Sequence, residues 1–463
     1  MNYSLSFLEE DYQALIRHLF VDRVIERAAY LFCKLSRSSE ETRLLVRTVI
    51  PVSQEEVVSA TGRDLVIKQE SYRRALKQAH LSDSCFVLVH SHPKDFPMHS
   101  PQDDVEEAAL FPSAYSRIHN NQLVHGSVVI SDANNPSGRV WLSDGSMEPM
   151  FRIRVLGRRF TFFDKDDESP VDIALFDRQI LAFGEHVQKI LSRLHIGIVG
   201  LGGTGSAVCQ QLARLGVGRL TICDPQRFES TNINRIYGSR MMDEAVLKSE
   251  IARHSVAEMG IGTTIQPIPK AITDEDVARE FRKCDIIFGC TDDEWGRSIL
   301  SKLSVMYLIP VFDMGVEVDG EGQTIKSVRG RVTTLMPCSA CLFCRGAITP
   351  DVVGAEILHA INPGEYEKRR REGYVPGLQG NAPAVIMFTS SVASAAVSEM
   401  LHRLTGYMGS SRESTEIVLR FDESKISINS KPSRPGCWCS DRSTWGRGDV
   451  DPLLDLTWPN RVQ

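Results

Sequence analysis

Long apolar runs are missing from this sequence, and their absence excludes one class of protein. No stretch of the 463 residues is long and apolar enough to cross a bilayer. The N-terminus, Met-Asn-Tyr-Ser-Leu-Ser-Phe-Leu-Glu-Glu-Asp, also lacks the basic and then apolar pattern of a secretion signal. We therefore expect a cytoplasmic protein that does not enter a membrane.

An excess of positive charge is also absent. The 53 Lys and Arg residues are outnumbered by 59 Asp and Glu residues, and the net charge of −6 is spread along the chain. Nucleic acid is therefore not expected as a partner, because its phosphates attract basic surfaces. The chain length, with 42% hydrophobic and 24% charged residues, favours two or three globular domains.

The sequence changes character near residue 164. Residues 1–160 alternate helical segments with β-rich apolar runs, and strands are expected at 44–52, 85–92, 127–131, 140–143 and 151–156. The stretch from Asp164 to Pro170 is charged and has no apolar period, so residues 161–173 are predicted to be a linker. Residues 174–463 then follow a strand, glycine-rich turn, helix and strand order, which is typical of a parallel sheet. Both domains are predicted to be α/β.

Two histidines close the apolar run that ends at residue 92. His90 and His92 lie two apart on the predicted strand, so both imidazoles point to the same side. Asp103 follows after ten intervening residues, in an acidic stretch that opens at Ser100. Two histidines, a carboxylate and an open fourth position form a plausible ligand set for a catalytic zinc ion.

This pattern resembles that of the JAMM (JAB/MPN-plus) metallopeptidases, which have a His-x-His pair, ten residues, an Asp, and a Ser three residues before that Asp. The resemblance implies a JAB-like α/β metallopeptidase domain over residues 1–160. His90, His92 and Asp103 would then bind zinc, and Ser100 would help to hold the tetrahedral oxyanion. Ser100 followed by a proline is also a good helix start, and both roles are compatible.

The same resemblance implies an upstream glutamate that acts as the general base. Glu26 matches the family's glutamate, because a small and apolar run follows it. Other acids precede the histidines as well, and they are Glu9, Glu10, Glu40 and Glu41. We therefore assign the base to Glu26 on the resemblance, with these four as alternatives.

A glycine cluster separates the first strand and the first helix of the second domain. Its members are Gly200, Gly202, Gly203 and Gly205. Such a turn brings backbone N–H groups and a helix N-terminus against phosphate. Asp224 ends the next strand, where an acid holds a ribose in dinucleotide-binding folds. On these residues alone, a dehydrogenase is a serious alternative.

The residues after Asp224 favour a triphosphate instead. Asn232, Arg235 and Lys248 follow it, and Asp292 comes just after the predicted strand 285–289. A nicotinamide cofactor has little use for two cations and a metal-binding acid at its phosphates. ATP with Mg²⁺ uses all three groups to manage its charge.

This set resembles the ThiF/MoeB/ubiquitin-activating superfamily, and the resemblance covers roughly residues 175–406. It implies a Rossmann-like adenylation domain with a mostly parallel sheet. The implied roles are ribose binding by Asp224, phosphate binding by Asn232, Arg235 and Lys248, and Mg²⁺ binding by Asp292.

Two further positions bear on the same resemblance. Phe176-Asp177-Arg178-Gln179 matches the superfamily's Arg-Gln entry motif, so Arg178 is expected to reach the γ-phosphate from the second subunit of a homodimer. Ala245 is a departure, because the superfamily usually has glycine three residues before the lysine. The local turn there is in question, but the role of Lys248 is not.

Five of the eleven cysteines fall in two tight groups. Cys341 and Cys344 form a Cys-x-x-Cys pair, and Cys437 and Cys439 could complete a structural zinc site. The superfamily often has two Cys-x-x-Cys pairs in these places. The second pair is one residue short here, so Cys338 could replace one ligand. The alternative to a zinc site is that these are core cysteines that bind nothing.

A catalytic cysteine is absent from its usual place. Ubiquitin-activating enzymes carry one in the crossover stretch, whereas this sequence has no cysteine between Arg345 and Gly436. We therefore expect the reaction to stop at an acyl-adenylate, or to pass the acyl group to a cysteine on another protein such as a conjugating enzyme.

The two resemblances together predict a bifunctional enzyme that acts on a ubiquitin-like carrier protein. A zinc (iso)peptidase would trim or deconjugate the carrier's C-terminus, and an ATP- and Mg²⁺-dependent adenylyltransferase would activate it, as in bacterial-type conjugation. One alternative is the same chemistry on a sulfur-carrier protein for cofactor or metabolite synthesis. Another is a binding scaffold in which one module is degenerate.

Overall fold

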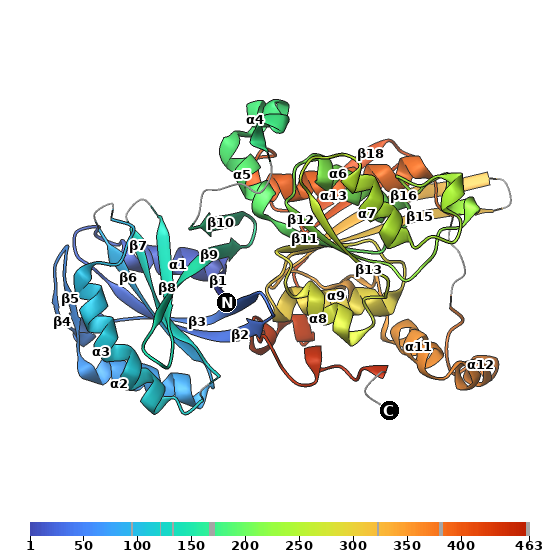
Figure 1. Cartoon of the computed structure of the whole chain (residues 1–463). Helices are drawn as coiled ribbons and strands as arrows, with labels where there is room; N and C mark the ends of the chain where they lie inside the picture. Colours follow the sequence, from blue (N-terminus) through green and yellow to red (C-terminus); the bar gives the residue numbers. More distant parts are fainter. Residues whose placement is uncertain are drawn as a thin grey trace. The chain divides into compact units, whose positions relative to one another are not determined.

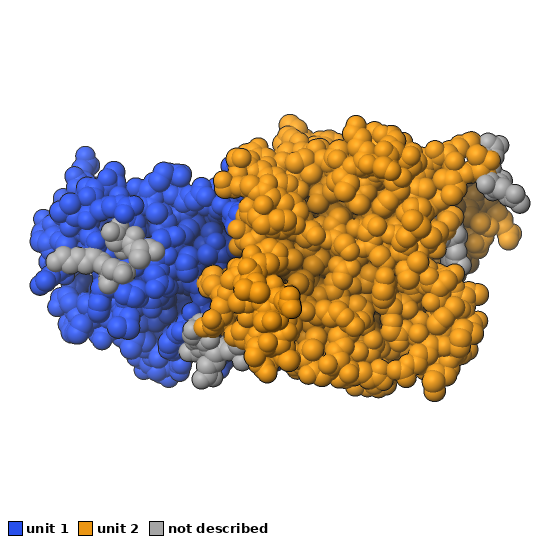
Figure 2. Space-filling model, turned by 90° about the horizontal axis from the view of Figure 1, so that it is seen from above, with its two compact units in different colours: residues 1–167, 446–449 blue, residues 168–445, 450–463 orange. Residues whose placement is uncertain are grey.

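The computed structural model describes residues 1–93, 96–120, 122–131, 134–165, 172–321, 324–378 and 383–459. The chain forms two compact units, which Figure 2 colours separately. The first unit contains Met1–Asp167 and Gly446–Asp449, and the second contains Glu168–Trp445 and Val450–Gln463. Across the described ranges, no helix has both the length and the apolar character to span a membrane.

One sheet of eight strands forms the framework of the first unit. In spatial order its strands are β1 (Asn2–Leu8), β3 (Glu41–Pro51), β2 (Ala28–Arg37), β6 (Cys85–His92), β7 (His125–Ser131), β8 (Pro136–Trp141), β9 (Met147–Leu156) and β10 (Phe160–Asp164). The sheet closes on itself, because β1 pairs with β3 along one edge and with β9 along the other.

The described residues of the first unit also contain three α-helices and a short hairpin. They are α1 (Glu9–Leu19), α2 (Gln69–Leu81), α3 (Pro101–Arg117) and the hairpin β4 (Val57–Ala60) and β5 (Leu65–Ile67). Helices α2 and α3 contact each other and cover β6 and β7 (Figure 1). All eight residues of β6 are buried, so the histidines at its end stand on a strand that the core holds in place.

Most strands predicted for the first unit are confirmed, and 85–92 coincides with β6. The prediction for 140–143 was displaced, because β8 begins at Pro136 and ends at Trp141. The predicted linker at 161–173 was wrong at its start. Residues 161–164 belong to β10, where Phe160 and Phe162 are buried and Asp164 Oδ1 accepts a 2.5 Å hydrogen bond from Arg152 Nε. Residues 166–171 of that linker lie outside the described ranges.

The segment Gly446–Asp449 belongs to the first unit, although residues 174–463 were expected to form one domain. Asp449 N–H donates to Leu35 O at 2.7 Å, and Arg37 N–H donates to Asp449 Oδ2 at 2.8 Å. These contacts lie on β2 beyond the part that pairs with β6. Gly448 has φ +68°, and a Cβ there would lie 2.3 Å from Leu35 O, so the approach requires glycine.

The second unit also contains an eight-stranded sheet. In spatial order its strands are β13 (Thr264–Ile268), β12 (Arg219–Cys223), β11 (His195–Val199), β14 (Ile286–Gly289), β15 (Val311–Glu321), β16 (Thr324–Leu335), β17 (Glu416–Arg420) and β18 (Lys425–Asn429). Pairings from β13 to β15 are parallel, whereas those from β15 to β18 are antiparallel. The expected parallel sheet is therefore only the half from β13 to β15, because β15 and β16 join as a hairpin.

Helices cover both faces of this sheet. The bounds are α4 (Asp177–Phe183), α5 (Glu185–Arg193), α6 (Gly203–Arg214), α7 (Lys248–Ala257), α8 (Glu275–Phe281), α9 (Glu294–Met306), α10 (Leu342–Arg345), α11 (Pro350–Ile361), α12 (Pro363–Arg371) and α13 (Ile386–Thr405). Helices α6 and α13 pack together on one face, and α8 and α9 lie on the other (Figure 1). Helix α6 begins at Gly203, four residues before the predicted start at Ala207, so the last glycines of the cluster form its first turn.

Candidate functional site

The end of β6 and the start of α3 bring the three predicted zinc ligands together. His90 Nε2 lies 3.2 Å from His92 Nε2 and 3.1 Å from Asp103 Oδ1. His92 Nε2 lies 3.6 Å from Asp103 Oδ2. Ligand atoms 2.0–2.1 Å from a tetrahedral zinc ion are about 3.3 Å apart, so the three spacings fit that ion.

Local hydrogen bonds orient these ligands. His92 Nδ1 lies 3.0 Å from Phe96 O, and because a carbonyl can only accept, Nδ1 carries the proton and Nε2 presents its lone pair to the site. Asp103 is held at the start of α3 by a reciprocal cap. Asp103 N–H donates to Ser100 Oγ at 3.2 Å, and Ser100 N–H donates to Asp103 Oδ2 at 2.5 Å.

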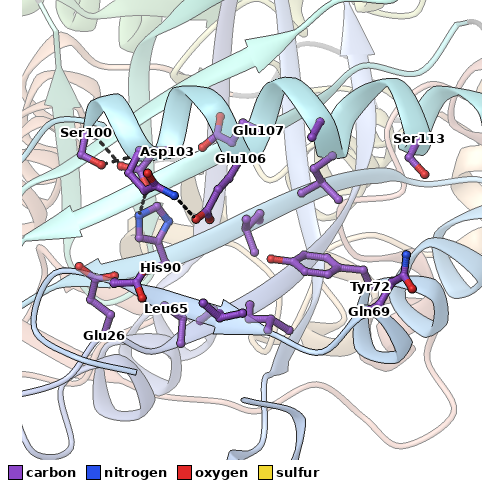
Figure 3. Close-up of a pocket in the computed structure, with 18 of the residues that line it drawn as sticks. Glu26, Leu65, Gln69, Tyr72, His90, Ser100, Asp103, Glu106, Glu107 and Ser113 are labelled. Carbon is purple, nitrogen blue, oxygen red and sulfur yellow. Dashed lines mark hydrogen bonds and ion pairs between the residues drawn. The ribbon is translucent and has the colours of Figure 1, made fainter. Parts of the chain in front are cut away.

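Glu26 faces the same pocket from the segment before β2 (Figure 3). Only 6% of the residue is exposed, and its backbone N–H donates to Thr61 O at 2.8 Å. Burial raises the pKa of Glu26 to about 7, although the charge of His90 acts in the opposite direction. A carboxyl group with a pKa near neutrality can both accept and return a proton, as a general base must.

The pocket in front of these residues has a volume of about 400 Å³. It extends from His90 between α2, α3 and β5 as far as Ser113, with Tyr72 on its wall (Figure 3). Leu65 and Leu110 add apolar surface. The arrangement is a partly apolar pocket with a candidate metal site on its wall, and a peptide segment could occupy it.

In the second unit the glycine cluster forms the turn between β11 and α6. Gly200 has φ +86°, and a Cβ on Gly205 would lie 1.8 Å from Gly200 O, so position 205 tolerates no side chain. Gly202 is the N-cap of α6, and Gly203 is its first residue. The N-terminus of α6 thus opens beside the turn, in the geometry that favours phosphate.

Asp224, Lys248 and Asp292 lie close to one another at the carboxyl ends of the parallel strands. Burial raises the pKa of Asp224, while the charge of Lys248 lowers it and that of Asp292 raises it further. Asp224 Oδ2 accepts a hydrogen bond from Leu201 N–H at 2.7 Å, which ties the acid to the glycine turn. Lys248 Nζ donates to Gln226 Oε1 at 2.5 Å, and Asp292 is exposed.

The remaining predicted phosphate ligands have local contacts. Asn232 is buried, whereas Arg235 is half-buried and donates from Nη1 to Thr231 O at 3.0 Å. The side chain of Arg178 on α4 is 90% exposed and lies 3.8 Å from Asp177. The structure therefore gathers the glycine turn, Asp224, Lys248 and Asp292 but leaves Arg178 in solvent.

Four cysteines form the second candidate metal site. Cys341 Sγ lies 3.7 Å from Cys437 Sγ, Cys344 Sγ lies 3.7 Å from Cys439 Sγ, and the Sγ atoms of Cys437 and Cys439 are 3.5 Å apart. Thiolates 2.3 Å from a tetrahedral zinc ion are about 3.8 Å apart, so the set fits. Cys338 is exposed and outside this group, which argues against its substitution for a member.

Sequence reasoning missed three residues beside these sites. Gln226 Oε1 accepts a hydrogen bond from Lys248 Nζ, and His99 Nε2, just before α3, lies 3.8 Å from Glu107 Oε1 on that helix. Glu107 follows Asp103 by four residues, so helical periodicity alone could have placed both on one face of α3. Gln226 and His99 carry no comparable signal, because their contacts depend on how distant segments meet.

Two curated proteins are similar to part of this chain. Adenylyltransferase and sulfurtransferase UBA4 of Yarrowia lipolytica is 29% identical over 193 residues, which is 39% of this chain and 46% of that protein. Molybdopterin-synthase adenylyltransferase of Escherichia coli is 27% identical over 186 residues, 39% of this chain and 73% of that protein. This chain thus spans under half the length of the first relative.

Among solved structures, E. coli MccB with ATP is 17% identical, has a TM-score of 0.45 and covers 58% of this chain and 74% of its own. The ThiF family model matches residues 176–439, more than half of the chain, and it does not extend to residues 1–160. The chain belongs to the ThiF family.

Proposed function

We propose that the second unit adenylates the C-terminal carboxylate of a small ubiquitin-like or sulfur-carrier protein, with ATP as the co-substrate and Mg²⁺ as the cofactor. The observation that carries this proposal is the placement of the glycine turn, Asp224, Lys248 and Asp292 together, in a chain of the ThiF family. The carboxylate would attack the α-phosphorus of ATP, and pyrophosphate would leave.

Each residue has a defined task in this reaction. Backbone N–H groups of the glycine turn and the N-terminus of α6 hold phosphate oxygens. Asp224 holds the ribose, and Lys248, oriented by Gln226, neutralises charge that develops on the leaving pyrophosphate. The exposed carboxylate of Asp292 would hold Mg²⁺, and Asn232 and Arg235 would bind phosphate oxygens of ATP.

The sulfur-carrier reading is better supported than conjugation. Two similar proteins are named adenylyltransferase and sulfurtransferase UBA4 and molybdopterin-synthase adenylyltransferase. The lack of cysteine between Arg345 and Gly436 agrees with release of the acyl-adenylate to another protein. We therefore favour a sulfur carrier that ends in Gly-Gly as the substrate.

Exchange of pyrophosphate into ATP tests the adenylation, because the exchange needs no later acceptor. With Mg²⁺ and a carrier that ends in Gly-Gly, wild type should catalyse exchange, whereas Lys248→Ala should lose about 100-fold or more. Lys270→Ala is the matched control, since Lys270 is a surface lysine that pairs with Asp276. Equal exchange by wild type and Lys248→Ala would refute the assignment.

A second activity is favoured by the geometry around His90. We propose that the first unit hydrolyses the peptide or isopeptide bond that follows the carrier's C-terminus. Zinc bound by His90, His92 and Asp103 would act as a Lewis acid that polarises the scissile carbonyl and acidifies water. Glu26 would accept the water proton and return it to the leaving amine.

Ser100 has the hydrogen-bonding capacity for its predicted role. Its Oγ accepts the Asp103 N–H, so its own hydroxyl proton remains available for the developing oxyanion.

Metal analysis and a cleavage assay test the peptidase. His92→Ala should lose one zinc ion per chain, whereas Glu26→Gln should keep it and lose cleavage. Full cleavage by Glu26→Gln would remove Glu26 from the mechanism, and inactive wild type with bound zinc would favour the scaffold alternative.

The oligomeric state and the cysteine cluster complete the proposal. A homodimer would allow the solvent-exposed Arg178 to reach the γ-phosphate in the partner's site. A structural zinc ion on Cys341, Cys344, Cys437 and Cys439 would tie α10 to the segment near residue 438.

A further inference from the structure

Glu107 is a buried carboxylate beside the candidate peptidase site that the proposed chemistry does not use. It is 2% exposed and lies on α3, four residues after Asp103 (Figure 3). Its Oε2 accepts three hydrogen bonds, from Ser127 Oγ at 2.7 Å, Trp141 Nε1 at 2.7 Å and Arg139 Nε at 2.8 Å. Ser127 lies on β7, and the other two donors lie on β8.

The same carboxylate reaches the loop before α3 through a chain of hydrogen bonds. Ser127 has one hydroxyl proton, which it donates to Glu107, so its oxygen accepts from His99 Nε2 at 2.9 Å. His99 immediately precedes Ser100, the residue that caps α3. Glu107 therefore attaches α3 directly to β7 and β8. It is also connected to the loop before α3, through Ser127 and His99.

We propose that Glu107 is a positioning residue, which fixes Asp103 and Ser100 against the histidines of β6. Asp103 and Ser100 are coupled by their reciprocal cap, so loop and helix move together. Glu107 stands one turn, about 6 Å along the axis, from Asp103. Metal ligands must be held to within about 0.5 Å, and a contact one turn away on the same helix supplies that restraint.

The alternative is that Glu107 serves only the stability of the core. An ion pair such as Glu107–Arg139 can often be replaced by apolar residues of similar volume with little loss of stability. An apolar residue would also fill this space, but it would leave the Ser127 hydroxyl without its acceptor and would break the hydrogen-bonded link between α3 and His99. The hydrogen bonds of Glu107 to β7 and β8, and through Ser127 to His99, therefore indicate a positioning role that burial alone would not.

This inference rests on the proposed zinc site, and zinc itself is the probe. In the full-length protein, Ser127→Ala and Glu107→Gln should bind Zn²⁺ about 10-fold more weakly in competition with a chelator, the lower end of the loss that follows removal of a residue bonded directly to a metal ligand. The visible spectrum of the Co²⁺-substituted protein should change with them. His92→Ala supplies the background from the cysteine cluster, which is then subtracted.

Matched variants separate positioning from general damage. Asp104→Asn removes the other carboxylate that pairs with Arg139, and the Asp104 side chain is 54% exposed, so this variant should keep wild-type affinity. His99→Gln can still donate to Ser127 and should bind zinc more tightly than His99→Ala. Wild-type affinity and spectrum in both Ser127→Ala and Glu107→Gln would overturn the inference.

Two further outcomes are also decisive. If Glu107→Gln does not fold, Ser127→Ala decides alone, because it breaks the chain between His99 and Glu107 and leaves the ion pair intact. If His92→Ala holds as much zinc as wild type, the proposed metal site is absent and the positioning role is overturned with it. If wild type binds zinc normally and both Ser127→Ala and Glu107→Gln keep wild-type affinity, the positioning role alone is overturned.

Discussion

Glu26 is the residue whose burial has the clearest consequence for pH dependence. Its pKa is raised from 4.5 to about 7, so the folded state favours the protonated form. For an acid shifted upward, this contribution to stability is present below pH 4.5 and is lost as the pH rises through about 7. Ionised Glu26 therefore destabilises the zinc-free first unit at alkaline pH.

Glu26→Gln should remove this destabilisation, because glutamine does not ionise. In zinc-free protein at pH 8, the variant should be more stable than wild type by at most about 3 kcal/mol, whereas at pH 5 most of the difference should vanish. Thermal unfolding of both proteins at the two pH values measures this stability difference. A stability difference that is the same at both would show that the ionisation of Glu26 is not responsible.

Ala245 is a residue-scale departure from the ThiF family pattern. It has φ +64°, the left-handed conformation that glycine adopts without steric cost, so the turn before Lys248 is kept despite the substitution. Ala245→Gly should stabilise the second unit by about 1 kcal/mol and raise its melting temperature by about 2–4 °C. Ala257→Gly, at the end of α7, should instead be destabilising, and calorimetry of both variants checks the prediction.

At the scale of elements, the cysteine cluster joins the short helix α10 to a helical turn at Trp438–Ser440. Neither piece is long enough to be stable alone. Cys344→Ser should therefore lose the structural zinc and expose the segment after residue 431 to protease, whereas Cys338→Ser should change neither. Zinc analysis and limited proteolysis test both, and a Cys344→Ser variant that keeps its zinc would contradict the assignment.

At the scale of the whole molecule, a dimer decides whether Arg178 takes part in catalysis. Arg178→Ala and Asp292→Ala homodimers should each be nearly inactive in pyrophosphate exchange. A mixed dimer would rebuild one site, so an equal mixture should recover about a quarter of wild-type activity if subunits pair at random. Tagged subunits must first show exchange between dimers. No recovery after confirmed exchange would rule out action in trans.

The sequence by itself determined the parts whose signals are local. The strand at 85–92 with histidines two apart, the Ser100 cap before Asp103, and the strand, glycine turn and helix around Gly200–Gly205 were all correct. Each signal lies within one or two adjacent elements, where side-chain periodicity, capping and glycine conformation act over a few residues.

Only the tertiary structure decided what depends on contacts between distant segments. The sequence offered several upstream acids as the base, and the pairing of β2 with β6, with Ala28 opposite His90, places Glu26 beside the histidines. The inclusion of Gly446–Asp449 in the first unit and the contacts of Glu107 with β7 and β8 also depend on contacts between distant segments. Strand pairing and burial join residues far apart in the chain, and no local pattern records which segments will meet.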